Sequence, residues 1–155
     1  MEGDPRREKA EIKAYRLLAL RAHSEKELRA KLLAAGFGEG LVAEVIGKCR
    51  ELGYLDDGKY ARQRTRELAV NRLAGDRRIA ADLRERGIAE NLVREAIAQI
   101  RQEFSEEDAL ARIVRKRSKG REVVGMDEKE RVRMARNLMG RGFSPGLVFK
   151  MLNQT

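Results

Sequence analysis

The chain has 155 residues and a formal net charge of +9, with 38% charged and only 5% aromatic residues. This length allows one domain or an array of small units, and the scarcity of aromatic residues argues against a compact, aromatic-rich enzyme core. The longest uncharged run, residues 142–149, is far shorter than the roughly 20 apolar residues of a membrane span. Because Cys49 is the single cysteine and no signal segment precedes the first helical pattern, we expect a cytoplasmic protein.

Apolar residues recur at helical spacing along nearly the whole chain, and no stretch alternates as a half-buried strand does. The pattern therefore predicts an all-α protein. The predicted helices cover residues 7–22, 25–36, 40–53, 57–74, 77–87, 90–103, 106–118, 128–141 and 146–153.

Polar residues that can cap helices mark where several of these helices begin. Ser24 and Asp127 each precede a glutamate by three residues, which is the spacing of a capping box. The other candidate N-caps are Asp76, Ser105 and Ser144, the last followed by a proline at the first helical position.

An internal repeat is centred on three glycines, Gly36, Gly87 and Gly142, each at the predicted end of a helix. In every copy apolar residues stand four and eight positions before the glycine, Phe or Ile follows it directly, and an apolar pair follows five residues later. The spacing predicts three three-helix units over residues 9–56, 57–104 and 105–155, after an N-terminal tail of residues 1–8. A basic loop, residues 118–126, interrupts the third unit.

Such a unit buries little apolar surface by itself, so its neighbours must stack against it. We expect an elongated, curved solenoid with a concave face.

Residues able to perform chemistry are scarce. His23 and Cys49 are the only residues of their types, which leaves no metal-ligand set and no plausible His-activated nucleophile. The glycines of residues 36–40 follow a helix and lack the Gly-Lys-Ser/Thr of a phosphate loop, and the acidic pair Asp56-Asp57 suits a helix N-terminus. We therefore expect no catalytic residue, no metal and no cofactor.

Basic residues provide the strongest functional indication. Charges balance up to Asp57, and the whole positive surplus lies beyond it. Such a surplus favours a polyanion partner, although solvated helix surfaces would carry the same charges. Few aromatic side chains are free for base stacking, so contact with the nucleic-acid backbone is the expected mode. The candidate contact residues are Arg66, Arg72, Arg77, Arg78, Arg115, Lys116, Arg117, Arg136 and Arg141.

Two sequence elements resemble those of a known family. Arg21-Ala22-His23-Ser24 is followed by Glu27-Leu28, and Gly53-Tyr54-Leu55-Asp56-Asp57 is followed by Tyr60-Ala61. With Arg86-Gly87-Ile88 and Arg141-Gly142-Phe143-Ser144 further along, they resemble the RecX regulators of the bacterial recombinase RecA over residues 10–152.

The resemblance implies a small, non-enzymatic protein of tandem three-helix repeats, and we expect it to be a monomer. It implies binding in the groove of the RecA–DNA filament, with contacts to RecA and to the backbone of single-stranded DNA. There the protein would limit filament extension, ATPase, strand exchange and co-protease activity. The residues alone leave two other functions open, a sequence-nonspecific nucleic-acid-binding protein without a RecA target and a helical-repeat adaptor for an acidic protein.

Overall fold

The structure is a computed structural model that describes residues 3–120 and 123–153. Within these ranges the chain is helical and contains no strand, which confirms the predicted all-α class. The α-helices are Pro5–Leu20 (α1), Glu25–Ala34 (α2), Glu39–Glu51 (α3), Asp57–Arg66 (α4), Asp76–Glu85 (α5), Glu90–Glu103 (α6), Glu106–Arg117 (α7), Glu128–Gly140 (α8) and Pro145–Leu152 (α9). None of these helices is long and apolar enough to cross a membrane.

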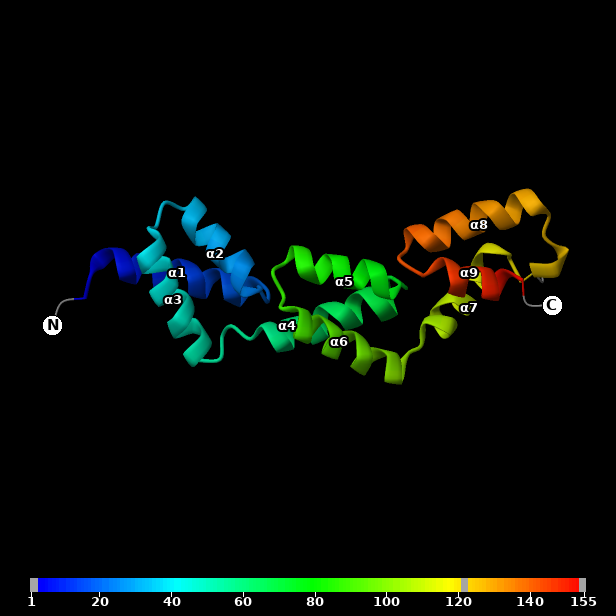
Figure 1. The fold of residues 1–155 in the computed structure, drawn as a ribbon. Coiled ribbons are helices and arrows are strands. Elements are labelled where there is room, and N and C mark those ends of the chain that lie inside the picture. The colour runs from blue at the N-terminus through cyan, green and yellow to red at the C-terminus, as the bar shows by residue number, and fades with distance from the viewer. Residues whose placement is uncertain (1–2, 121–122, 154–155) are drawn as a thin grey trace.

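The helices form three successive bundles along an elongated, gently curved molecule (Figure 1). The first bundle is α1–α3, the second is α4–α6 and the third is α7–α9, and each has its own apolar core. Helices pack chiefly against helices of the same bundle. The predicted tandem array of three-helix repeats is therefore confirmed.

Three glycines of the repeat close the middle helix of each bundle in the same way. Gly36, Gly87 and Gly142 have φ angles of +97°, +80° and +100°, the left-handed region that glycine enters without strain. The amide of the next residue then donates to a carbonyl five residues earlier in the chain, as Ile88 does to Leu83 at 3.0 Å. The apolar residue that follows the glycine is fully buried in the third bundle, where it is Phe143, and more exposed in the first, where it is Phe37.

Most predicted caps are present. Ser24 forms a complete capping box with Glu27, and Ser105, Asp127 and Ser144 each accept the backbone amide of the third residue of the helix that follows. Asp76 is a correction, because Gly75 is the N-cap of α5 and Asp76 is the first helical residue. Its carboxylate accepts from Arg101 Nε at 2.7 Å, so it joins two helices of the bundle instead of capping one.

Three other predicted segments differ in extent. The first helix begins at Pro5, because Asp4 accepts the amide of Arg6, so residues 5–8 of the predicted tail are helical. The predicted helix 57–74 is α-helical only to Arg66 and continues as a π-helical turn, Glu67–Asn71. The predicted loop 118–126 contains a short 3-10 turn, Val123–Gly125, and residues 121 and 122 of it lie outside the described part of the chain.

Candidate binding surface at the junctions of the bundles

The middle helices α2, α5 and α8 lie head to tail along one edge of the molecule (Figure 1). At the first junction the Ser24 hydroxyl, at the N-terminus of α2, donates to the carbonyl of Arg86 at the end of α5 at 2.7 Å. At the second junction the amide of Gly75, at the N-terminus of α5, donates to the carbonyl of Arg141 at the end of α8 at 2.8 Å. An Arg-Gly pair therefore contacts the N-terminus of the neighbouring middle helix at both junctions. The pair is Arg86-Gly87 at the first junction and Arg141-Gly142 at the second.

The first junction is electrically neutralised by carboxylates. Arg86 donates to Glu27 at 3.1 Å, to Asp82 at 2.9 Å and to the Tyr60 hydroxyl at 3.1 Å. Burial alone would raise the pKa of Glu27, but the hydrogen bond from the Ser24 amide and the guanidinium of Arg21 hold that pKa at about 2. The arginine here therefore serves the structure of the junction.

The second junction is lined by arginines instead. Its hollow of about 560 Å³ lies between the second and third bundles, and we call it the arginine hollow. The lining residues are Leu68, Arg72, Ala74, Arg78, Arg136, Asn137, Gly140 and Arg141. Within the described residues, the one ion pair that any of these four arginines makes joins Arg72 to Glu67, with a long separation of 3.9 Å.

Arg141 is the anchor of the arginine hollow. Its guanidinium donates to Asn137 Oδ1 and to the carbonyl of Arg72, each at 3.2 Å. Partial burial, followed by the positive charges of Arg117 and Arg78, lowers the pKa of Arg141 from its usual value. Because like charges are held close together here, a bound anion would relieve their repulsion.

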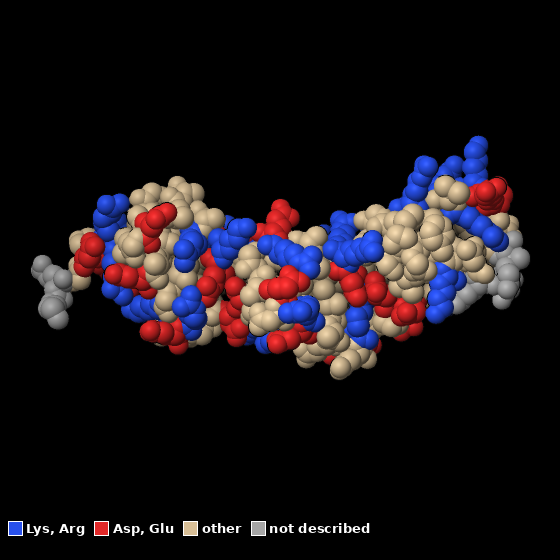
Figure 2. All heavy atoms as spheres, viewed as in Figure 1, with Lys and Arg blue, Asp and Glu red and all other residues tan. Residues whose placement is uncertain are grey.

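Basic side chains also extend beyond the hollow. Figure 2 shows Lys and Arg side chains over α8 and near the end of α5 that faces it, along the hollowed upper edge of the molecule. On that edge basic side chains gather at several places, with uncharged and acidic side chains between them. A polyanion following this edge would meet arginines from two bundles at once.

The structure brings together some of the predicted contact residues and separates others. Arg72, Arg78, Arg136 and Arg141 line the arginine hollow, and Arg117 acts on the pKa of Arg141. The remaining four are exposed and do not line the hollow: Arg66 pairs with Glu103, and Arg115 and Lys116 lie in the last turn of α7. Arg77 lies in the first turn of α5, where its backbone amide donates to the carbonyl of Gly142 at 3.1 Å.

Sequence reasoning missed Asn137, which orients the Arg141 guanidinium. It also could not separate the arginines of the hollow from those neutralised by carboxylates, such as Arg64, which pairs with Asp82 at 2.9 Å. One signal was available, because Arg-Gly occurs at residues 86–87 and at 141–142, the two places where a neighbouring bundle docks.

The residues that could have suggested chemistry have structural partners. Cys49 is buried in the core of the first bundle, as predicted for a small apolar side chain. His23 Nε2 lies 2.9 Å from Lys31 Nζ, which can only donate, so Nδ1 carries the proton and donates to the Arg21 carbonyl at 3.0 Å. Among the described residues, His, Cys, Asp and Glu side chains form no cluster that could hold a metal ion.

The fold and the hollow define a helical-repeat protein with an arginine-lined junction. Family models for the first and the second three-helix domain of RecX match residues 10–49 and 56–97. "Regulatory protein RecX" of Syntrophotalea carbinolica is 30% identical over 141 residues, which cover 91% of this chain and 92% of that protein. The same-named protein of Halorhodospira halophila is 38% identical over 131 residues, covering 84% and 78%.

Solved structures show the same fold. The crystal structure of RecX from Lactobacillus salivarius superposes with a TM-score of 0.77 at 20% identity, over 94% of each chain. A second RecX crystal structure has a TM-score of 0.75 at 22% identity and covers 98% of this chain and 78% of its own. The chain belongs to the RecX family of regulatory proteins.

Proposed function

We propose that this protein is a cytoplasmic, monomeric and non-enzymatic negative modulator of the RecA recombinase. It binds in the groove of the RecA–DNA filament and limits filament extension, ATPase, strand exchange and co-protease activity. Its proposed modules are residues 9–56, 57–104 and 105–155. The observation that supports DNA contact is the arginine hollow. Arg78, Arg136 and Arg141 line it together, and no carboxylate is among its lining residues.

Guanidinium groups grip phosphate through paired hydrogen bonds, and this contact reads no base sequence. The hollow joins two bundles, so a phosphate held there would touch both of them. When this protein lies in the filament groove and contacts both DNA and recombinase protomers, it hinders the addition of the next protomer.

The test is the single-strand-DNA-dependent ATPase of the cognate RecA, with this protein titrated from far below to above the RecA concentration. We expect inhibition well below one-to-one, because one molecule in the groove affects a whole filament segment. The variant Arg78→Glu/Arg136→Glu should inhibit at least tenfold less well. Lys13→Glu/Arg16→Glu, which makes the same change of charge on exposed residues of α1, should inhibit like the wild type.

A sequence-nonspecific nucleic-acid-binding protein is the second candidate, and the same hollow favours it. Tight binding to free DNA, with no effect on RecA at equimolar protein, would support this function and contradict the first. Equal inhibition by the Arg78→Glu/Arg136→Glu variant, with its helical content intact, would remove the hollow from either mechanism.

A further inference from the structure

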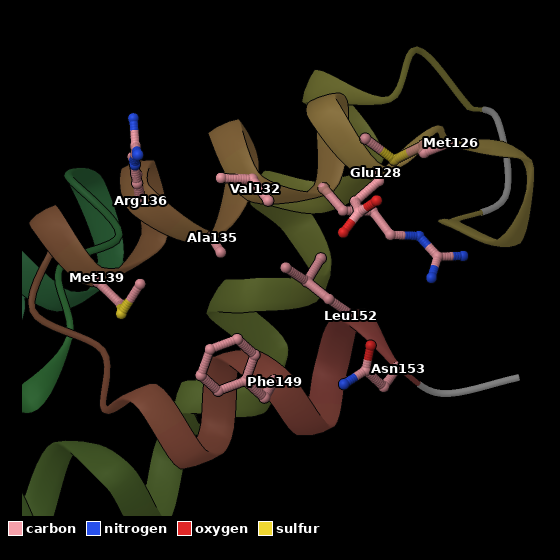
Figure 3. A pocket seen from close by; sticks show the side chains of 10 residues that line it. Met126, Glu128, Val132, Ala135, Arg136, Met139, Phe149, Leu152 and Asn153 are labelled. Carbon is pink, nitrogen blue, oxygen red and sulfur yellow. The ribbon is translucent and has the colours of Figure 1, made fainter.

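A second depression lies beside the arginine hollow and has a different character. It is a groove of about 730 Å³ between α8 and α9 in the third bundle, and we call it the apolar groove. Figure 3 shows Val132, Ala135 and Met139 of α8 on one side and Phe149 and Leu152 of α9 on the other. Met126 closes one end.

The walls of the apolar groove are unusually exposed for their chemistry. Phe149 is 52% and Val132 is 46% exposed, although both side chains are large and apolar. The deeper residues Ala135 and Leu152 belong to the core of the third bundle, so the floor is fixed by packing. Exposed apolar side chains gathered over a rigid floor are typical of a protein-binding groove.

The length and form of the groove suit a helix. It follows α8, whose thirteen residues extend for about 20 Å. A partner helix of about three turns, with apolar residues at positions i, i+3 or i+4 and i+7, would set its anchors between α8 and α9.

Charge around the groove indicates what else the partner helix carries. Arg131 and Arg136 line the groove itself, and Lys129 and Arg133 lie on the adjoining flank of α8. The carboxylates that line these two surfaces are Asp127 and Glu128, and Glu130 lies in the same turn of α8, so the four basic groups remain in excess. Positive flanks favour a helix with Asp or Glu beside its apolar anchors. They disfavour a second copy of this chain, because the same positive face would meet itself.

We propose that the apolar groove docks an acidic amphipathic helix of a protein partner. Arg136 lines both the apolar groove and the arginine hollow, so the two surfaces are continuous. The third bundle therefore holds protein through the groove while the hollow holds phosphate. This inference rests on the proposed function, in which the partner is the recombinase in its filament.

The experiment measures binding to an immobilised filament of the cognate RecA on single-stranded DNA, and in parallel to the free single strand. The variant Val132→Ser/Phe149→Ser removes apolar contact without changing charge. Its control is Ile12→Ser/Leu52→Ser, which changes residues of the first bundle that are 43% and 49% exposed. We expect the groove variant to bind the filament at least tenfold more weakly, with the control and every affinity for free DNA within twofold of the wild type.

A photoreactive benzoylphenylalanine in place of Val132 identifies the occupant directly. We expect it to cross-link to RecA within a helix that carries apolar residues at helical spacing and carboxylates beside them. Cross-links confined to a basic or non-helical segment would overturn the proposed chemistry of the partner.

The remaining outcomes separate the two proposals. Absence of wild-type binding to the filament overturns the proposed function and this inference together. Wild-type binding that the serine variant retains overturns the groove alone. An equal loss of affinity for free DNA would assign the groove to nucleic acid instead. A wild-type dimer that the serine variant abolishes in sedimentation would assign the groove to a second copy.

Discussion

Gly75 and Gly142 meet at the second junction, where a side chain on Gly75 would overlap the backbone of Gly142 and a side chain on Gly142 would overlap Arg78. A Cβ atom on Gly75 would lie 2.4 Å from the carbonyl carbon of Gly142. The three nearest atoms that it would meet are all backbone, so relief requires movement of a whole bundle. The geometry of the arginine hollow thus depends on two residues that carry no charge.

Gly75→Ala should therefore open the second junction. We expect a loss of about 1–3 kcal/mol in the free energy of unfolding, because the overlap cannot be relieved by a rotamer change. Urea denaturation measures the loss, and small-angle scattering should show a changed overall shape. Gly47→Ala is the control, since a Cβ atom there meets nothing within 4 Å and alanine favours the interior of α3. A variant Gly75→Ala as stable as the wild type would contradict this account.

Arg86→Ala should destabilise the first junction by about 2–3 kcal/mol. The substitution leaves the half-buried carboxylates of Glu27 and Asp82 without one of their donors. Arg84→Ala removes a pair with Glu90 in which both side chains are about half exposed, and it should leave stability almost unchanged because solvent screens such a pair. Thermal or urea unfolding measures the loss of stability in both variants. Equal losses would show that Arg86 does not stabilise the first junction.

Acid should weaken the same junction. The folded-state pKa of Glu27 is about 2, below its unfolded value of about 4.3, so its contribution is complete above pH 5 and disappears as the pH falls toward 2. We expect this loss to be about 1 kcal/mol, because solvent screens a pair that reaches the surface. Glu27→Gln should flatten the stability profile between pH 5 and 2, whereas Glu44→Gln, on the exposed face of α3, should leave its slope unchanged. Parallel profiles for Glu27→Gln and the wild type would refute the prediction.

Arg136→Ala should lower the affinity for single-stranded DNA without changing stability, because its side chain is exposed. If it contacts one phosphate, the slope of log affinity against log salt should become shallower by about 0.7. The affinity should fall to the same extent for unrelated DNA sequences. Arg66→Ala, whose guanidinium is engaged by Glu103 outside the hollow, serves as the comparison and should retain the wild-type slope. A loss that depends on base sequence would contradict backbone contact.

The sequence predicts the repeat well because its signals are local. Gly36, Gly87 and Gly142 indicate left-handed helix ends. Side chains such as Ser24 and Ser144 indicate N-caps, because each bonds an amide only three residues later. The positions of Asp76 and of the π-helical turn could not be predicted in this way. The carboxylate of Asp76 accepts a hydrogen bond from Arg101, which lies 25 residues further along the chain. This long-range contact overrides the local preference of aspartate for the N-cap position.

The candidate surface was predicted only in part for a related reason. Nothing in the sequence distinguishes Arg66 from Arg136 as a contact residue. In the structure Glu103 on a neighbouring helix pairs with Arg66, whereas Arg136 lines the hollow. Selecting the arginines of the hollow requires the positions of carboxylates on other helices. Likewise, helical spacing marks Val132 and Phe149 as apolar but does not show that they face each other across an open groove.

The way in which α2, α5 and α8 join has a consequence for self-assembly. A head-to-tail contact between unlike ends adds further copies without limit whenever a free acceptor remains at one end of the array. On α2 the acceptor that corresponds to the carbonyls of Arg86 and Arg141 belongs to Ala35, and the carbonyl of the next residue, Gly36, accepts from Arg6 of α1 at 3.3 Å. The position before Gly36 is Ala35, where the two junctions have an arginine. The end of α2 thus lacks the arginine that both junctions share and is partly engaged by α1, and we expect no head-to-tail polymerisation of this protein.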